Sequence, residues 1–582
     1  MAKYLILTEN DQEYNQNENL ILVQEKAIPY LLKNELIKKG KHVEALPEIT
    51  FGPQEVSVKT KYLEGVYKYV MERLTSYLNR LHGEEHDQKF WEIAFGIFVP
   101  NLIYDFYDVY LELKQADELC HDAISSLEVD ENADVYGWRN FLLEEPDANY
   151  FCTIAADILD VIDVSFQVNV KRTARTAPHS LEHLQRDAIW TPKELSRRMD
   201  SKTEVVLCTP YLSNEALDGI ISASNGRVKL WSGRGRDIVY SVLEKCIDTD
   251  YKERRALNYE KTDDEFINVI LSSIVNHLPV PYCEGYKIMR EQVEPLVSSC
   301  NAKVVASANS YVYSHPYDLW SAMMYEKGAK VCAMQHGGNV EFRFESMIFD
   351  RVYLWGTATA GSKTHSGVAG KLIGRSISQK PPIERKELLF ISTGFNRFRN
   401  EYLWPLSFSV EKQIKNKISF IEKISKSEEY TIKVREYMKD YGRDRVANHL
   451  DTLRNVQMQN SRLVPLDSAL EECSLCVIDN YQTVILEAIY LDVPTIFVCG
   501  ILDNVPLSEE LRDLLRRFEL EGLYFRDTDQ AADYVNSIKD PRAWWNEPGR
   551  KALIDEFKHK YAYVPDDWAE QYVDMLYDWE ND

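Results

Sequence analysis

The stretch from Lys303 to Trp355, KVVASANSYVYSHPYDLWSAMMYEKGAKVCAMQHGGNVEFRFESMIFDRVYLW, decides the fold. Its apolar runs at 303–308, 330–334 and 350–355 have the length of buried strands, and residues 318–327 between the first two predict a helix. Strands that alternate with helices at this spacing indicate parallel βαβ units. The stretch therefore predicts an α/β fold with a parallel sheet.

The same alternation extends in both directions. Upstream, we predict strands over 204–208 and 228–231 and helices over 215–223 and 292–299. Downstream, we predict strands over 387–392, 430–435, 462–464, 475–478 and 495–498, and helices over 410–425, 443–458 and 483–491. Two such series predict two Rossmann-like domains facing a cleft, with ligands bound at the carboxyl ends of the strands.

The segment 375–386, RSISQKPPIERK, is the best linker in the chain, because it carries a Pro–Pro pair and four cations but few apolar residues. We therefore place an N-terminal domain at 1–374 and a C-terminal domain at 387–560. The remaining residues, 561–582, are expected to form a helix that crosses back to the N-terminal domain.

The first 200 residues show a different pattern. The apolar runs 3–8 and 20–23 predict two strands. From Tyr62 to Leu81, apolar residues recur at three- and four-residue steps, as on an amphipathic helix, and 91–115 resembles a more buried helix. We predict a mostly helical insertion over about 50–200.

Composition and charge exclude several classes of protein. The 582 residues include 68 Lys and Arg against 92 Asp and Glu, a formal net charge of −24. Duplex nucleic acid is a poor partner for so acidic a chain, since affinity there comes largely from cations on phosphates. With 45% hydrophobic and 12% aromatic residues, the chain is also not disordered throughout.

The sequence favours a cytoplasmic location. Ten Cys without a paired CxxC framework are typical of reduced thiols, and the first ten residues are too polar for a signal peptide. The most apolar long stretch, 90–107, is interrupted by Glu92 and Asp105, so it is not a clean membrane span. Peripheral association with the inner face of a membrane stays open.

Gln335-His336-Gly337-Gly338 follows a predicted strand and is the first candidate site. Glycines at such a position let a ligand or another backbone approach closely, and a histidine at a cleft mouth can act as a general base. The alternative is a histidine that caps a turn. The loop after residue 308 brings Asn309, Ser310 and His315 to the same side of the cleft, either for acceptor contacts or as a polar loop with an aromatic cluster.

A second candidate lies where residues 479–483 lead from a strand into a helix. Gln482 and Thr483 fall at the helix N-terminus, where unpaired N–H groups and the helix dipole attract phosphate. Glu487 is one turn further on, within reach of a ribose hydroxyl of the same nucleotide. The alternative is a plain N-cap and a solvated glutamate.

Cations at strand ends of the second half are candidates for a diphosphate or a sugar carboxylate. They are Arg435, Arg397 and Arg399, and each is as well explained by a surface strand end. Acidic pairs such as 105/108 and 263/264 have no strand end beneath them, so we expect no metal site.

Several of these segments together resemble a known family. NAKVVASANSYVYSHPYDLWSAMMYEKGAKVCAMQHGGNVEF followed by DRVYLWG is similar to the strand–QHGG block of a bacterial family of surface-carbohydrate transferases associated with O-antigen loci. FGPQEVSVKTKYLEGVYKYVMERLTSYLNRLHG and FWEIAFGIFVPNLIYDFYDVYLELKQA resemble the helical region of that family, and IKVREYMKDYG resembles its Arg-containing strand end. The resemblance covers about residues 3–500.

The resemblance implies a metal-independent glycosyltransferase of the two-Rossmann-domain, GT-B type. More distant kin transfer glycerol phosphate, or keto-sugar acids from a cytidine nucleotide. The donor would be a nucleotide sugar, bound as a substrate by the C-terminal domain, and no cofactor is implied. The acceptor, a glycan, a lipid-linked precursor or a protein, would lie on the N-terminal domain.

The resemblance also implies roles for single residues. His336 would be the base, Thr483 the phosphate holder, Glu487 the ribose contact and Arg435 the charge clamp. This sequence departs from the family in the loop 480–482, where Asn-Tyr-Gln precedes the one retained hydroxyl. That departure is the best support for a non-catalytic nucleotide- or glycan-binding protein on the same fold. A nucleotide-sugar epimerase or hydrolase is the other alternative.

Overall fold

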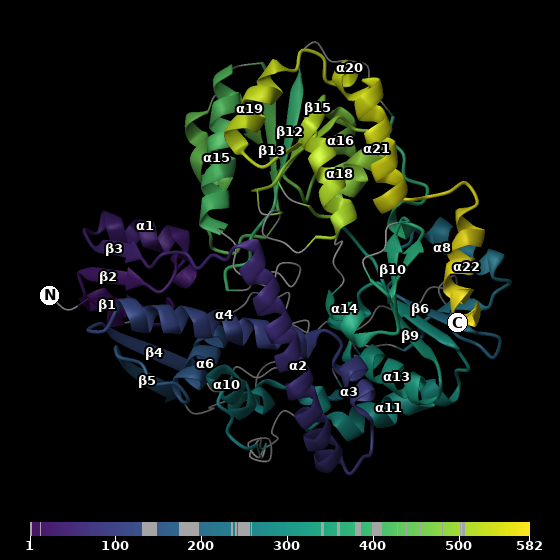
Figure 1. Cartoon of the computed structure of the whole chain (residues 1–582), viewed down its shortest axis with the longest axis horizontal. Helices are drawn as coiled ribbons and strands as arrows, with labels where there is room; N and C mark the ends of the chain where they lie inside the picture. Colours follow the sequence, from purple (N-terminus) through teal and green to yellow (C-terminus); the bar gives the residue numbers. More distant parts are fainter. Residues whose placement is uncertain are drawn as a thin grey trace.

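The computed structural model describes the chain except residues 1–2, 12, 131–147, 174–196, 234–236, 239–240, 243–256, 258, 339–342, 358–360, 379–385, 399–409, 428, 438, 454, 480, 501, 503–506 and 582. Within the described part there are three sheets, and the strands of each pair in parallel. Figure 1 shows sheet C in the upper lobe and sheets A and B side by side below it. The predicted α/β class is confirmed.

Sheet A has the strand order β3-β2-β1-β4-β5. Its strands are β1 (Tyr4–Ile6), β2 (Asn19–Leu22), β3 (His42–Ala45), β4 (Ile124–Asp130) and β5 (Gln167–Thr173). The accompanying helices are α1 (Tyr30–Lys38), α2 (Pro53–His82), α3 (Gln88–Phe95), α4 (Phe98–Leu119) and α6 (Ala148–Leu159). Two of these strands, β4 and β5, lie inside residues 50–200, which the apolar pattern had suggested to be mostly helical.

Sheet B has the order β11-β10-β9-β8-β6-β7. Its strands are β6 (Val205–Cys208), β7 (Val228–Leu230), β8 (Val304–Ser307), β9 (Lys330–Met334), β10 (Arg351–Trp355) and β11 (Thr364–Gly367). Between them run α8 (Asn214–Ala223), α10 (Glu265–Ser273), α11 (Tyr286–Ser298), α12 (Ser310–Tyr313), α13 (His315–Glu326) and α14 (Arg343–Ile348). The strand order reverses between β6 and β8, because β7 lies on one side of β6 and β8 on the other, so this is the switch point of the sheet.

Sheet C has the order β14-β13-β12-β15-β16-β17, which is the Rossmann order 3-2-1-4-5-6. Its strands are β12 (Glu387–Ser392), β13 (Thr431–Glu436), β14 (Val456–Met458), β15 (Leu475–Ile478), β16 (Thr495–Val498) and β17 (Tyr524–Phe525). Its helices are α15 (Val410–Ser427), α16 (Leu466–Glu472), α17 (Thr483–Tyr490), α18 (Glu509–Leu520), α19 (Thr528–Ser537), α20 (Pro541–Trp545) and α21 (Pro548–Tyr561).

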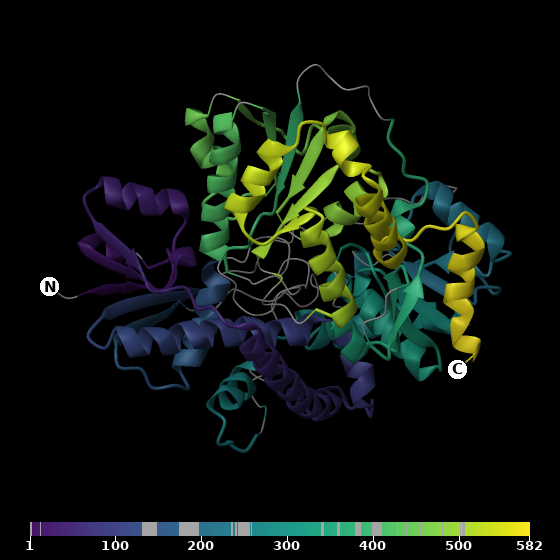
Figure 2. The same cartoon turned by 45° about the horizontal axis from the view of Figure 1, so that its top comes forward.

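The hydrophobic cores show which sheets belong together. One core joins sheet A, the long helices α2 and α4, and one face of sheet B, while sheet C has a core of its own. The last helix, α22 (Trp568–Tyr577), packs on α8 and covers the other face of sheet B. Figure 2, turned by 45°, shows the chain running from α21 on the sheet C lobe to α22 beside sheet B.

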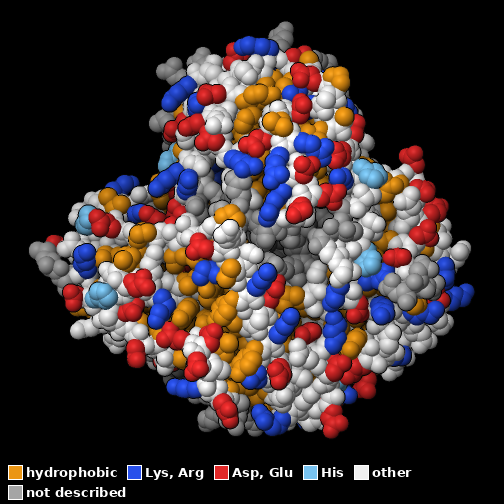
Figure 3. Space-filling model, in the orientation of Figure 1, with side chains coloured by type: hydrophobic (Ala, Val, Ile, Leu, Met, Phe, Trp, Pro, Cys, Tyr) orange, Lys and Arg blue, Asp and Glu red, His pale blue; other side chains and the backbone are white. Residues whose placement is uncertain are grey.

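Acidic and basic side chains are interspersed over the face seen in Figure 3, and several Lys and Arg side chains line the lower rim of the sheet C lobe. Among the helices of the described part, none combines the length and the apolar content that a bilayer crossing requires.

Candidate functional site

The loop after β9 in sheet B meets the N-terminus of α17 in sheet C. The Gly338 N–H donates to Thr483 Oγ1 at 3.2 Å. A Cβ atom on Gly337 would overlap Thr483 Oγ1, and one on Gly338 would overlap the carbonyl carbon of Gln482. Only glycine permits this approach, so the two segments singled out in the sequence form one site between the lobes.

Gln335 fixes the shape of the glycine loop. Its side-chain amide donates to the Gly337 carbonyl, and its carbonyl oxygen accepts from the Trp355 N–H at 2.6 Å. Gln335 is buried, so these bonds hold the loop against β10 in a place that water does not reach. Gln335 thereby positions the preceding strand end and the neighbouring histidine.

His336 is held through one of its two ring nitrogens. Nδ1 lies 3.1 Å from the Ala308 carbonyl oxygen, which can only accept, so Nδ1 carries the proton. Nε2 is then an acceptor, and no hydrogen bond reaches it from the described residues. The pKa of His336 is lowered to about 4, mainly by burial, while the bond to Ala308 opposes this shift and the charge of Lys371 adds slightly to it. The imidazole is therefore neutral near pH 7 and able to take a proton.

Tyr211, which the sequence reasoning missed, lies against His336. The two rings are stacked with centroids 5.7 Å apart and 29° between their planes. Asn309 Nδ2 donates to the Tyr211 hydroxyl at 2.5 Å. The signal available in the sequence was a polar aromatic segment, 209–211, directly after the predicted strand 204–208.

Ser310 supports this edge of sheet B from behind. Its N–H donates to Ser307 Oγ at 2.7 Å, and its hydroxyl donates to Cys208 Sγ at 2.9 Å. Because Ser310 is buried, its role in the structure is to join the ends of β6 and β8. His315 is also buried, edge-on to Tyr282, and burial lowers the pKa of His315 to about 3. It belongs to the core of the sheet B half, not to the cleft surface.

At the N-terminus of α17, the backbone supplies the donors. Gln482 is the N-cap in an extended conformation, with no side-chain bond to the cap N–H groups. Glu487, one turn further on, is buried and pairs with Lys371 at 3.0 Å and with Arg375 at 2.8 Å. Lys371 lies at the end of the N-terminal domain and Arg375 is the first residue of the predicted linker, and neither was singled out as a site residue.

The cations that were singled out have other partners. Arg397 is buried, pairs with Glu9 and donates to the carbonyl oxygens of Lys26 and Ala27, so it joins sheet C to sheet A. Arg435 donates to Gln459 Oε1 at 3.1 Å and to the Val464 carbonyl at 2.8 Å. Arg399 lies outside the described residues.

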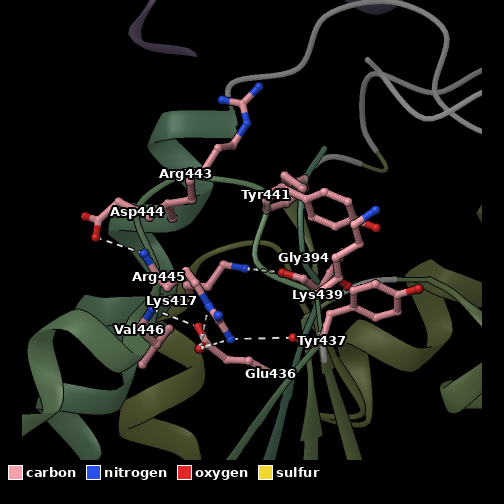
Figure 4. Close-up of a pocket in the computed structure, with 13 residues that line it drawn as sticks. Gly394, Lys417, Glu436, Tyr437, Lys439, Tyr441, Arg443, Asp444, Arg445 and Val446 are labelled. Atoms are coloured by element: carbon pink, nitrogen blue, oxygen red, sulfur yellow. Dashed lines mark hydrogen bonds and ion pairs between the residues drawn. The ribbon is translucent and has the colours of Figure 1, made fainter. Parts of the chain in front are cut away.

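A pocket opens on sheet C at the carboxyl ends of β12 and β13 (Figure 4). Its charged lining is Lys417, Lys439, Arg443, Arg445, Glu436 and Asp444. Arg445 pairs with Glu436 at 3.0 Å, and Tyr437 stacks on Tyr441 with 6.0 Å between ring centroids. His336 and Thr483 are not among the residues that line it, so this pocket is distinct from the glycine-loop site.

In the part of the chain that the structure describes, no group of three or more His, Cys, Asp or Glu side chains is arranged to hold a metal ion.

Residues 3–576 match the LIC12162 family transferase. The chain is a member of this transferase family. The match spans nearly all of the sequence, so it covers both lobes and the site between them. The prediction that the protein is an enzyme is confirmed at the level of a transferase.

The likenesses to other known proteins are weaker. No curated protein sequence is significantly similar to this chain. The solved structures that match include S. aureus MnaA with UDP, with 10% identity and a TM-score of 0.34 over 65% of this chain and 97% of that one. Acinetobacter baumannii MurG has 10% identity and a TM-score of 0.33 over 65% and 99%. The lipopolysaccharide outer core galactosyltransferase WaaB has 9% and 0.32 over 65% and 99%. Likenesses at these TM-scores assign neither fold nor function.

Proposed function

We propose that this transferase is a metal-independent glycosyltransferase. It would move a sugar from a nucleotide-sugar donor to a surface glycan, a glycan precursor or a protein. The observation that supports the proposal is the contact of the His336 loop with the N-terminus of α17, because a neutral imidazole then lies near a helix N-terminus, where anions are favoured. Membership of a transferase family supports the reaction class.

The donor phosphates would lie at the N-terminus of α17. The backbone N–H groups there point outward from the helix, and the helix dipole favours negative charge. Lys371 and Arg375 are cations that pair with Glu487 of this helix. When a diphosphate enters, they would turn to it, and Glu487 would be left to accept a hydrogen bond from a ribose hydroxyl.

The transfer needs one base and one stabilised leaving group. His336 Nε2 would take the proton of the acceptor hydroxyl while that oxygen forms its bond to the sugar carbon. The bond from the same carbon to the phosphate oxygen breaks, and the electron pair leaves with the nucleoside diphosphate. The α17 N–H groups and Lys371 would stabilise the negative charge on the departing nucleoside diphosphate. Electrostatic stabilisation of this kind is the largest single contribution to catalysis in many enzymes.

Thermal unfolding of the protein against CMP, CDP, UDP, GDP and their sugars tests the proposal. A ligand that binds only the folded state stabilises it by about 2.7 kcal/mol at 100 times its Kd. We expect one nucleobase to raise the melting temperature, and Thr483→Val to abolish that rise. Thr528→Val is the matched control, since Thr528 is the first residue of α19 as Thr483 is of α17. No rise with any nucleotide at millimolar concentration would contradict the proposal.

A further inference from the structure

Tyr211 keeps a large exposed surface at the centre of the site. Its exposed fraction is 43%, although one side of the ring lies against His336 and the hydroxyl is held by Asn309. Many other tyrosines of the chain are buried. Tyr211 instead lies at the switch point of sheet B, where the chain segments that follow β6 and β8 diverge. An exposed aromatic at such a position is available to a ligand.

The backbone holds Tyr211 at a conformational cost. Its φ is +54°, and Thr209 two residues earlier has φ +40°. Non-glycine residues in the left-handed region are uncommon. Each one raises the free energy of the folded state by about as much as one hydrogen bond lowers it. Such strain persists where the surrounding structure imposes it, here through the bond of Thr209 Oγ1 to Ser310 Oγ at 2.6 Å and that of Asn309 to the Tyr211 hydroxyl. Observed strain of this kind concentrates at functional sites.

We propose that Tyr211 is the platform on which the acceptor sugar ring stacks, and that the acceptor is therefore a pyranoside with one C–H face buried against the phenol ring. This inference rests on the proposed function and adds the chemical class of its acceptor. A pyranose ring carries C–H groups on one face and hydroxyls around its rim. Burial of that face on an aromatic ring gains free energy as for other apolar surface.

The geometry favours the acceptor over the donor as the occupant. Tyr211 belongs to the same sheet edge as His336, whereas the proposed phosphate site belongs to sheet C. His336 lies against one face of the phenol ring, so a sugar ring would stack on the opposite face, and its rim hydroxyls would reach the imidazole past the edge of the phenol.

Saturation-transfer NMR with methyl pyranosides of glucose, galactose, mannose and N-acetylglucosamine, with and without the nucleotide found by thermal unfolding, tests the inference. We expect saturation on the C–H protons of one or more pyranosides with the wild type and with Tyr211→Phe. In Tyr211→Gly the affinity should fall about tenfold, the size of an aromatic contact. Glycine adopts a positive φ without strain, so this variant is expected to fold.

Two controls make the result specific. Tyr437→Ala removes another exposed tyrosine, on sheet C, and should leave pyranoside binding unchanged. The rise in melting temperature with nucleotide should be the same in Tyr211→Gly as in the wild type.

Each contrary outcome has its own meaning. Equal pyranoside binding by Tyr211→Gly and the wild type would overturn the platform, as would nucleotide binding that is lost in Tyr211→Gly. Nucleotide binding without binding of any pyranoside would overturn the inference and leave the donor site standing. No binding of either ligand would overturn the inference together with the proposed function.

Discussion

At the scale of single residues, the candidate site depends on the close approach of Gly337 and Gly338 to Thr483 and on the ion pair of Lys371 with Glu487. His336, Gly337 and Gly338 were found because a strand followed by a Gly–Gly pair demands close approach, and the structure brings this loop to Thr483. Lys371 was missed because its partner Glu487 is more than a hundred residues away. Pairing at that distance depends on how the two lobes pack, which residue spacing does not reveal.

The protonation of His336 gives a prediction about pH. Because burial lowers its pKa to about 4, the imidazole stays neutral and able to act as a base down to that pH in the free enzyme. We expect the acid limb of kcat/KM to have its midpoint near pH 4, and His336→Asn to lower kcat by about 10²–10⁴ with nucleotide binding retained. A midpoint near 6.5 that persists in His336→Asn would show that another group is the base.

Gly338 gives a second prediction at this scale. A methyl group there would overlap the Gln482 carbonyl carbon, so Gly338→Ala must push α17 away from the loop. We expect at least a tenfold loss of transfer with little change in the melting temperature, because each lobe keeps its own core. Gly361→Ala is the control, since a Cβ there meets nothing within 4 Å.

At the scale of elements, most inner strands were predictable, β4 being an exception, whereas most edge strands were not, β7 being an exception. The apolar runs 387–392, 475–478 and 495–498 became β12, β15 and β16, whose residues are nearly all buried. By contrast, β3 alternates between exposed and half-buried residues, and β14 buries only Val456. The predicted helix over 443–458 was wrong, since the structure has a 3-10 helix at Val446–Thr452 followed by β14. Edge strands bury too few side chains to leave a clear apolar run.

The N-terminus of α17 gives a prediction that distinguishes the role of Lys371 from that of Arg435. Lys371→Gln should weaken binding of a nucleoside diphosphate about tenfold and leave binding of the nucleoside unchanged, because only the phosphates would contact it. Arg435→Gln should lower the melting temperature without changing either affinity, since Arg435 donates to the loop at 459–464. Isothermal titration of both variants checks this. The opposite pattern would restore Arg435 as the charge clamp.

At the scale of the whole molecule, sheet A joins the two lobes that form the site. It shares a core with sheet B, and it reaches sheet C through the Arg397–Glu9 pair and the hydrogen bond from the Tyr30 N–H to the Gly442 carbonyl at 2.8 Å. From the sequence, Arg397 was a candidate for binding the donor, because Arg397 follows the end of a predicted strand. The partner that engages it comes from a sheet whose full extent the sequence did not reveal.

The Arg397–Glu9 pair should help to fix the position of the sheet C lobe relative to sheet A. Removing one partner of a buried ion pair costs about 3–5 kcal/mol, so Glu9→Gln and Arg397→Met should each lower the melting temperature. Because Glu9 is partly exposed, we expect the lower end of that range. The double variant should be less destabilised than the sum of the two, and additivity would show that the pair contributes no coupling.

The most direct test of the glycosyltransferase account is a crystal structure with the nucleoside diphosphate that raises the melting temperature. We predict its phosphates at the backbone N–H groups of Thr483 and its neighbours, with Lys371 Nζ turned from Glu487 to a phosphate oxygen and Glu487 on the ribose. Phosphates seated instead in the pocket of Lys417, Lys439 and Arg445, away from His336, would contradict the account.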